Sequence, residues 1–288
     1  MNINNIVECA GWEIIFSFVH SMFRGFQIQL DILNLDAFER RGKEMFNAFS
    51  SEIRPILNQY LLPNGALNGS KMQDDWFPNA DVDIFISHSH ADKELAIAFA
   101  GWLYEKFEMV AFIDSCIWGH VDDLLYQIDK EHCWNPSTET YNYQKRNRST
   151  AHVHMMLNTA LTKMIDHCEC LFFLRTPHST LSNMVRTKTD SAWIYSEISQ
   201  TQVIRKKIPK RSTTTQLMKA FSGDRMMNES EKKALKVEYF LELGHLPALS
   251  DNELRRWDRD WNALENSKTG HALDKLYEIK PLKTRRPL

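Results

Sequence analysis

The stretch VDIFIS at Val82–Ser87 is a short and almost continuous apolar run, and MVAFID at Met109–Asp114 repeats the pattern. Runs of this kind are typical of strands that are buried on both faces of a parallel sheet. Between them, apolar side chains recur every four residues and predict a helix: Leu95, Phe99, Leu103 and Phe107. Strand, helix and strand over so short a span predict a crossover unit with two parallel strands.

The alternation continues toward the C-terminus. We expect a helix over 152–166, a strand over 170–174, a helix opened by Asp190 or Ser191, a late strand over 237–243, and helices over 251–264 and 272–279. Such alternation predicts an α/β fold with a flavodoxin-like, doubly wound parallel sheet. The polar segment at about 130–150 is expected to be an insertion.

The N-terminal part has a different pattern. From Trp12 to Leu33 apolar residues recur at spacings of four and three, which predicts a helix with a heptad seam, and a second helical stretch is expected over 36–61. We therefore divide the chain into a helical N-terminal region with a linker, 1–79, and an α/β domain, 80–288. The helices either pack on that domain or mediate self-association.

Charge, cysteine content and hydropathy limit the class of protein. The chain has 35 basic and 37 acidic residues, a near-balance that argues against a dedicated binder of nucleic acid or of membrane surfaces. Five scattered cysteines give no disulfide framework. No stretch resembles a signal peptide or a membrane span, so a cytoplasmic location is expected.

The end of the first strand offers one candidate metal site. His88, His90 and Asp92 have the spacing His-x-His-x-Asp, which resembles the metal loop of the metallo-β-lactamase superfamily. That motif continues with a histidine where this chain has Lys93. Asp92 also has the spacing for a capping box with Ser89. A metal-dependent hydrolase is therefore kept as the less favoured alternative.

A second candidate site lies on the helix that begins near residue 191. Trp193 and Glu197 are four residues apart and share one face of this helix. A carboxylate near a helix N-terminus is favoured as the anion, and beside an aromatic wall it suits a reaction that develops positive charge. Cleavage of a nicotinamide glycosidic bond is such a reaction, with an oxocarbenium-like transition state.

Three motifs in order resemble the Toll/interleukin receptor (TIR) domain family. DIFISH at 83–88 is similar to its first strand. FID at 112–114, followed by Gly119, is similar to its second strand and the start of its BB loop. SAWIYSEI at 191–198 is similar to the helix that carries the catalytic glutamate of NAD-cleaving members. The resemblance covers 81–204 and implies a flavodoxin-like fold.

The resemblance also implies roles for individual residues. Glu197 would be the catalytic carboxylate and Trp193 would shape its pocket. Other residues would line the binding site for NAD⁺, which would be the substrate: Ser87, His88 and His90 at the first strand, and Trp118, Gly119 and His120 in the BB loop. No cofactor and no metal are expected.

The family resemblance is closest to bacterial antiviral, Thoeris-like proteins. It implies an NAD⁺ glycohydrolase or ADP-ribosyl cyclase that releases nicotinamide and an ADP-ribose-derived product or signal in antiphage defence. It also implies a homo-oligomer, formed through TIR surfaces and the N-terminal helices, and a downstream effector that senses the product. The alternative is a non-enzymatic signalling adaptor that acts by self-assembly.

Overall fold

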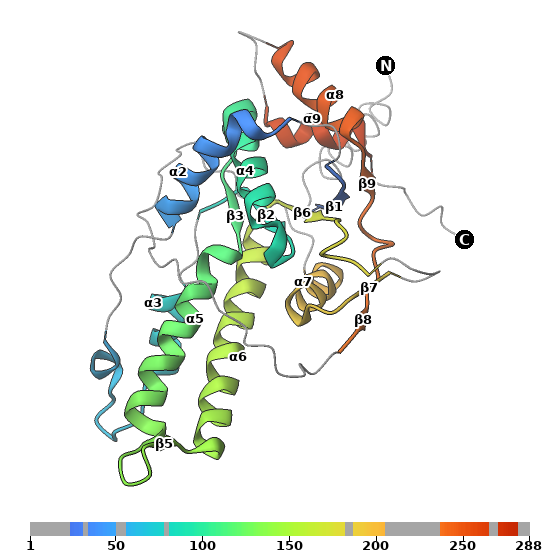
Figure 1. The fold of residues 1–288 in the computed structure, drawn as a ribbon. Helices are drawn as coiled ribbons and strands as arrows, with labels where there is room; N and C mark the ends of the chain where they lie inside the picture. Colours follow the sequence, from blue (N-terminus) through green and yellow to red (C-terminus); the bar gives the residue numbers. More distant parts are fainter. Residues whose placement is uncertain are drawn as a thin grey trace, which may run out of the picture.

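A five-stranded parallel sheet runs through the centre of the molecule, in the order β3-β2-β6-β1-β9 (Figure 1). The computed structural model describes residues 24–30, 34–49, 56–77, 81–181, 187–204, 237–264 and 270–281. The sheet consists of β1 Arg24–Ile28, β2 Ile84–Ser87, β3 Ala111–Ile113, β6 Cys170–Leu174 and β9 Ala248–Leu249. The expected α/β class is confirmed, and the strands over 82–87, 109–114 and 170–174 lie where the sequence predicts them.

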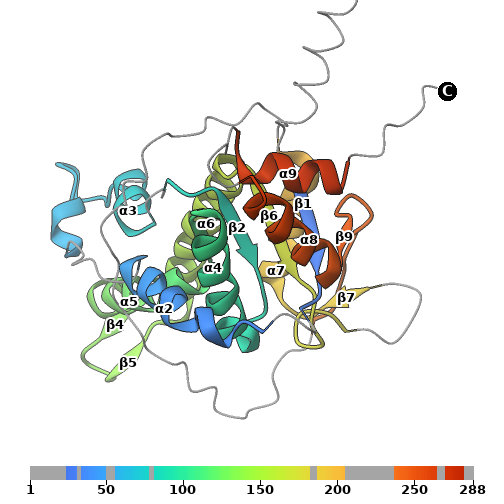
Figure 2. The same cartoon turned by 90° about the horizontal axis from the view of Figure 1, so that it is seen from above.

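Helices cover both faces of this sheet (Figure 2). One face packs on α4 (Lys93–Phe107), α8 (Asp251–Asn262) and α9 (Ala272–Ile279), through a core that includes Ile84 and Ile86. The other packs on α5 (Ser115–Ile128), α6 (Tyr143–His167) and α7 (Ala192–Val203), through a core that includes Phe85. Two further helices lie outside these layers, with α2 (Glu39–Phe49) against α4 and α3 (Gly69–Trp76) against α6.

The helix expected across Trp12–Leu33 is wrong at Arg24–Ile28, which form the strand β1. The sequence of β1 is RGFQI, in which Phe26 and Ile28 are the two large apolar residues. A run this short does not distinguish a strand from part of a helix by its spacing. Residues 12–23 and 31–33 lie outside the described part of the chain. The helix expected over 36–61 is present over Glu39–Phe49 as α2, whereas Leu57–Tyr60 form a 3₁₀ turn and residues 50–55 lie outside the described part.

Because β1 pairs with β6 and β9, the sheet contains residues from both sides of the boundary expected at residue 79. Among the strands of the main sheet, the chain runs from β2 to β3 and then to β6. In the sheet these strands lie side by side in the order β3-β2-β6, which is how the flavodoxin-like strand order begins. The next position belongs to β1, which comes first in the sequence. The sheet is compatible with a flavodoxin-like fold whose fourth strand is supplied from the N-terminal side.

The segment expected to be an insertion extends a pair of long helices (Figure 1). Beyond α5 the chain forms a π-helical turn η4 (Asp129–Cys133) and a hairpin of β4 (Trp134–Asn135) and β5 (Thr140–Tyr141), and α6 then begins at Tyr143. The helix expected over 152–166 therefore begins earlier, within the expected insertion. The Asn142 side chain accepts a hydrogen bond from the backbone N–H of Lys145 and starts the helix there.

The late strand expected over 237–243 is only the two-residue β8 (Tyr239–Phe240), which pairs with β7 (Lys188–Thr189) outside the main sheet. The fifth strand of the main sheet is β9, two residues long, which the apolar pattern did not reveal. Three single turns of 3₁₀-helix complete the described elements: η1 (Asp36–Phe38), η2 (Leu57–Tyr60) and η3 (His90–Asp92). Among the described helices, none provides the long apolar stretch that crossing a bilayer demands.

Two glycines allow α2 and α4 to approach each other closely. A Cβ atom on Gly42 would lie 1.9 Å from the carbonyl oxygen of Ile97, and one on Gly101 would lie 2.2 Å from that of Phe38. Aromatic rings join α4 to α8: Phe107 stacks on Trp257 with ring centroids 3.9 Å apart. The Trp257 Nε1–H donates to the Ala272 carbonyl and joins α8 to α9.

We expect Gly42→Ala to destabilise the protein by about 2 kcal/mol or more, because the added methyl group meets backbone atoms that cannot yield without separating two helices. Urea denaturation of the full chain measures this change. Gly244→Ala is the matched control, since a Cβ there would meet no atom within 4 Å, and its effect should stay within about 0.5 kcal/mol. Equal stability of the two variants would contradict the close packing of α2 on α4.

Candidate active site

The candidate site lies where the winding of the sheet reverses. The connection from β2 to β3 places α4 on one face, and the connection from β3 to β6 places α5 and α6 on the other. The carboxyl ends of β2 and β6 are therefore the position at which open α/β sheets bind ligands. Thr176, just after β6, donates its hydroxyl to the Asp92 carboxylate at 2.5 Å and joins the two strand exits.

Glu197 projects from α7 into this region and is 1% exposed. The Ser87 hydroxyl at the end of β2 donates a hydrogen bond to Glu197 Oε2 at 2.6 Å. Asp114, the first residue after β3, is also buried and lies close enough to Glu197 for the two carboxyl groups to interact. The ends of two neighbouring strands and one helix therefore bring a pair of carboxyl groups together.

The environment of Glu197 favours its protonated form. Burial raises the pKa of Glu197 well above its usual value, and the Asp114 carboxylate raises it further. The hydrogen bond from Ser87 acts in the opposite direction and is the weaker effect. Ionising Glu197 beside a second buried carboxyl group is costly, so we expect Glu197 to be protonated in the folded protein.

His88 completes the cluster on the side of Asp114. Its Nδ1 lies 3.0 Å from Asp114 Oδ1, and both side chains are almost completely buried. The imidazole thus lies against the carboxyl group that is in turn close to Glu197. We call Ser87, His88, Asp114 and Glu197 the carboxyl cluster.

The expectation that the helix dipole keeps Glu197 ionised is wrong. α7 begins at Ala192, with Ser191 as its N-cap, so Glu197 lies in the second turn. The influence of the helix terminus falls off within the first turn. At this position the loss of hydration and the neighbouring carboxylate outweigh it.

Trp193 lies on the same helix face but is half-buried against α6, where its ring meets the His154 ring edge-on with centroids 5.7 Å apart. Burial lowers the pKa of His154, which favours the neutral imidazole at that contact. The structure therefore places the Trp193 ring between α6 and α7.

The segment compared with the BB loop is helical, because α5 begins at Ser115, directly after Asp114. His120 lies on α5 and is fully buried. Trp118 and Gly119 belong to the same helix, and their side chains lie outside what the structure describes. His90 is exposed on η3 and is not part of the carboxyl cluster.

The residues of the alternative metal site point to different partners. His88 faces Asp114, His90 is exposed, and Asp92 accepts the hydroxyl of Thr176. Among the described residues, no group of three or more histidine, cysteine, aspartate or glutamate side chains is arranged to hold a metal ion. The capping box expected from Ser89 is also absent, since Ser89 makes no side-chain cap at η3.

Asp114 is the member of the carboxyl cluster that sequence reasoning did not select. The usable signal was its position, a carboxylate directly after a buried strand and next to the strand that ends in Ser87. Cys116 lies nearby, and burial together with Asp114 raises the pKa of its thiol to about 12. This thiol donates to the Ile113 carbonyl and acts as a packing group.

In the part of the chain that the structure describes, cavities of about 390 Å³ lie at both ends of the β1–β9 pair. The first lies beside the starts of β1 and β9, and the second beside the ends of β1 and β9, with Arg175 in its wall. Glu197 lines neither of them. No family model, curated protein or solved structure matches this chain.

The raised pKa of Glu197 predicts how the stability of the protein depends on pH. An acid whose pKa is raised by folding costs stability as the pH rises above its ordinary pKa, because the unfolded chain then ionises and the folded chain does not. Glu197→Gln mimics the protonated group and removes this loss. Between about pH 5 and pH 7 the free energy of unfolding should fall less steeply, by up to about 1.4 kcal/mol per pH unit.

Urea denaturation at several pH values measures the slope. Glu131→Gln, at an exposed position on η4, is the matched control and should keep the slope of the parent chain. A Glu197→Gln slope identical to that of the parent would mean that Glu197 is ionised in the folded protein.

Proposed function

We propose that the chain is an NAD⁺-cleaving enzyme, a glycohydrolase or ADP-ribosyl cyclase, with Glu197 as its catalytic carboxylate. The observation that carries this proposal is the placement of Glu197 beside Ser87 and Asp114 at the point where the sheet reverses its winding. The resemblance of DIFISH at 83–88 and SAWIYSEI at 191–198 to NAD-cleaving TIR domains supports it. On the same basis we extend the proposal to antiphage signalling.

The proposed reaction needs one negative charge near the ribose. The bond between ribose C1′ and the nicotinamide nitrogen breaks, and its electron pair neutralises the positive charge of the ring. An ionised Glu197 stabilises the positive charge left on the ribose. Water, or a nucleophilic group of the same dinucleotide, then attacks C1′. The leaving group departs neutral, so no general acid is required.

The proton on Glu197 has to leave before this charge is available. The nicotinamide ring of NAD⁺ is a cation, and an opposite charge within a few ångströms lowers the pKa of a carboxyl group. Substrate entry would therefore favour the form that the reaction uses. Because Glu197 is 1% exposed, entry also requires α7 or the start of α5 to move away from the cluster. We interpret this structure as the closed state of the enzyme.

The same burial is the one observation that favours a non-enzymatic adaptor, in which the carboxyl cluster has only a structural role. The two proposals differ in a single measurable reaction, the release of nicotinamide. Incubation of the chain with NAD⁺, at both low and high protein concentration, followed by mass spectrometry of all products, distinguishes them. It also identifies the product as ADP-ribose, a cyclic isomer or a conjugate.

We expect Glu197→Gln and Glu197→Ala to reduce nicotinamide release at least about 100-fold, because each removes the charge that stabilises the ribosyl cation. Glu131→Gln should retain the activity of the parent chain. Circular dichroism confirms that each variant is folded. Full turnover by a folded Glu197→Gln chain would contradict the proposed role.

Asp114→Asn should move the acid limb of the pH–activity profile to lower pH by about one unit or more. The substitution removes the charge that raises the pKa of Glu197, so the catalytic form persists at lower pH. Initial rates between pH 4 and pH 9 measure the shift, and Glu131→Gln should leave the limb in place. A limb that stays fixed or moves to higher pH in Asp114→Asn would show that Glu197 does not titrate against Asp114.

A further inference from the structure

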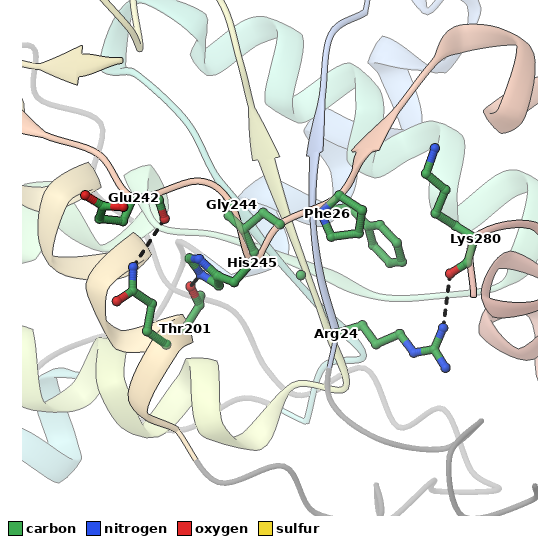
Figure 3. Close-up of a pocket in the computed structure, with 11 residues that line it drawn as sticks. Arg24, Phe26, Thr201, Glu242, Gly244, His245 and Lys280 are labelled. Carbon is green, nitrogen blue, oxygen red and sulfur yellow. Dashed lines mark hydrogen bonds between the residues drawn. The ribbon is translucent and has the colours of Figure 1, made fainter. Parts of the chain in front are cut away.

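The cavity beside the ends of β1 and β9 has the size of a small-molecule site, about 390 Å³. Its wall consists of the ends of these two strands, Arg175 directly after β6, and the first residues of α8. The carboxyl cluster lies at the ends of β2 and β3, so both sites belong to the same edge of the sheet, where open α/β sheets bind ligands. Figure 3 shows the other cavity, which lies at the opposite edge, beside the starts of β1 and β9.

The strand register places this cavity in line with the carboxyl cluster. Ser87 of β2 and Gln27 of β1 pair with the same residue of β6, Phe173, from its two sides. Side chains in one row of a parallel sheet point to the same face, so Gln27 lies on the face where Ser87 meets Glu197. Two strand spacings, about 10 Å, separate Ser87 from Gln27. A ligand that lies along this edge therefore spans both sites.

Arg175 supplies a positive charge on the side of the cavity that is nearer to the cluster, since β6 is the neighbour of β2. Its side chain is half-buried, and its Nη1 donates to Gln27 Oε1 at 3.3 Å. The Gln27 Nε2 group donates in turn to the Leu246 carbonyl at 2.9 Å, which fixes the amide that orients the guanidinium. Among the described residues, no carboxylate forms an ion pair with Arg175, so its charge is available to a ligand.

The first turn of α8 forms the other side of the cavity and has a different character. Asp251, Asn252 and Glu253 line it. They follow β9, and β1 separates that strand from β6 and Arg175. The Lys280 ammonium lies 2.7 Å from the Glu253 carboxylate and offsets its charge. Carboxylates accept hydrogen bonds from ribose hydroxyl groups, and carboxamides match the hydrogen-bonding edge of adenine. This side of the cavity therefore suits a nucleoside better than a phosphate.

We propose that this cavity binds the adenosine diphosphate half of NAD⁺, with the diphosphate on Arg175 and the adenosine against the first turn of α8. The inference rests on the function proposed above. Along the sheet edge the carboxyl cluster, Arg175 and the start of α8 follow one another in the order of the ribose that carries nicotinamide, the diphosphate and the adenosine. A planar guanidinium binds two phosphate oxygens at once. From β2 to β9 the edge measures three strand spacings, about 14 Å, which an extended dinucleotide spans.

The two halves of the proposed site differ in access. The cavity is already formed in this structure, whereas Glu197 is 1% exposed. The adenosine diphosphate half therefore binds to the closed chain, and the nicotinamide end enters when the carboxyl cluster opens. Binding at Arg175 holds the substrate beside the cluster until that movement occurs.

Calorimetric titration of the full chain with ADP and with adenosine, in the absence of divalent cations, tests the inference. We expect saturable binding of ADP, and binding of adenosine at least about ten times weaker, because adenosine lacks the group that Arg175 holds. Arg175→Gln should weaken the binding of ADP at least about tenfold. Asn252→Ala, at an exposed position of the same wall, should weaken it several-fold. Arg148→Gln, at an exposed position of α6, is the matched control and should bind ADP like the parent.

Two further variants separate this inference from the others. Glu197→Gln should bind ADP like the parent, because binding to the formed cavity needs no chemistry. Gln202→Ala, in the wall of the cavity at the opposite edge, should also leave the affinity unchanged. The inference is overturned if ADP does not bind, if adenosine binds as tightly as ADP, or if a folded Arg175→Gln chain binds ADP like the parent. Nicotinamide release is scored separately: its absence contradicts the proposed function, whereas the titration with ADP decides on this cavity.

Discussion

The position of β1 is the constraint on which the rest of the fold depends. In the described sheet β9 pairs only with β1, and β1 is the strand that joins it to β6. Through β9 the sheet also positions α8, whose N-cap Ser250 follows directly. Both faces of β1 are buried, and Gly25 leaves the space that Leu246 fills, since a Cβ there would lie 2.4 Å from Leu246 Cδ2. β1 is thus part of the central core.

The carboxyl cluster is stable because its charge is limited. A buried, ionised carboxylate is expensive, and two of them in contact are more so. Protonation of Glu197 and the imidazole beside Asp114 reduce that cost, and the Ser87 hydroxyl supplies a hydrogen bond. The same arrangement favours the protonated form of Glu197, whereas the proposed reaction uses the ionised form. Under the proposed function, the stability of the closed form and the ionisation that the reaction needs are opposed, and the positive charge of NAD⁺ would shift the balance.

The sequence predicted the elements whose pattern is local. Cys170–Leu174 and Ala272–Ile279 have the expected bounds, and the helix after Ser191 brings Glu197 to the end of β2. β1 was misread because Phe26 continues the three- and four-residue apolar spacing of its neighbours in the sequence, and five residues are too few to show a strand pattern of their own. β9 is too short to give a pattern. The protonation of Glu197 depends on Asp114, which a strand far from α7 in the sequence brings into contact.

The place of β1 in the sheet also determines when the fold can be completed during synthesis. Arg24–Ile28 leave the ribosome before either neighbour exists, since β6 and β9 belong to the second half of the chain. Contacts between such distant segments form slowly, because a long loop must close before they stabilise anything. Until then β1 has no strand to pair with, and its backbone is open to pairing with other chains. We therefore expect the growing polypeptide to be most prone to aggregation before β6 has been synthesised.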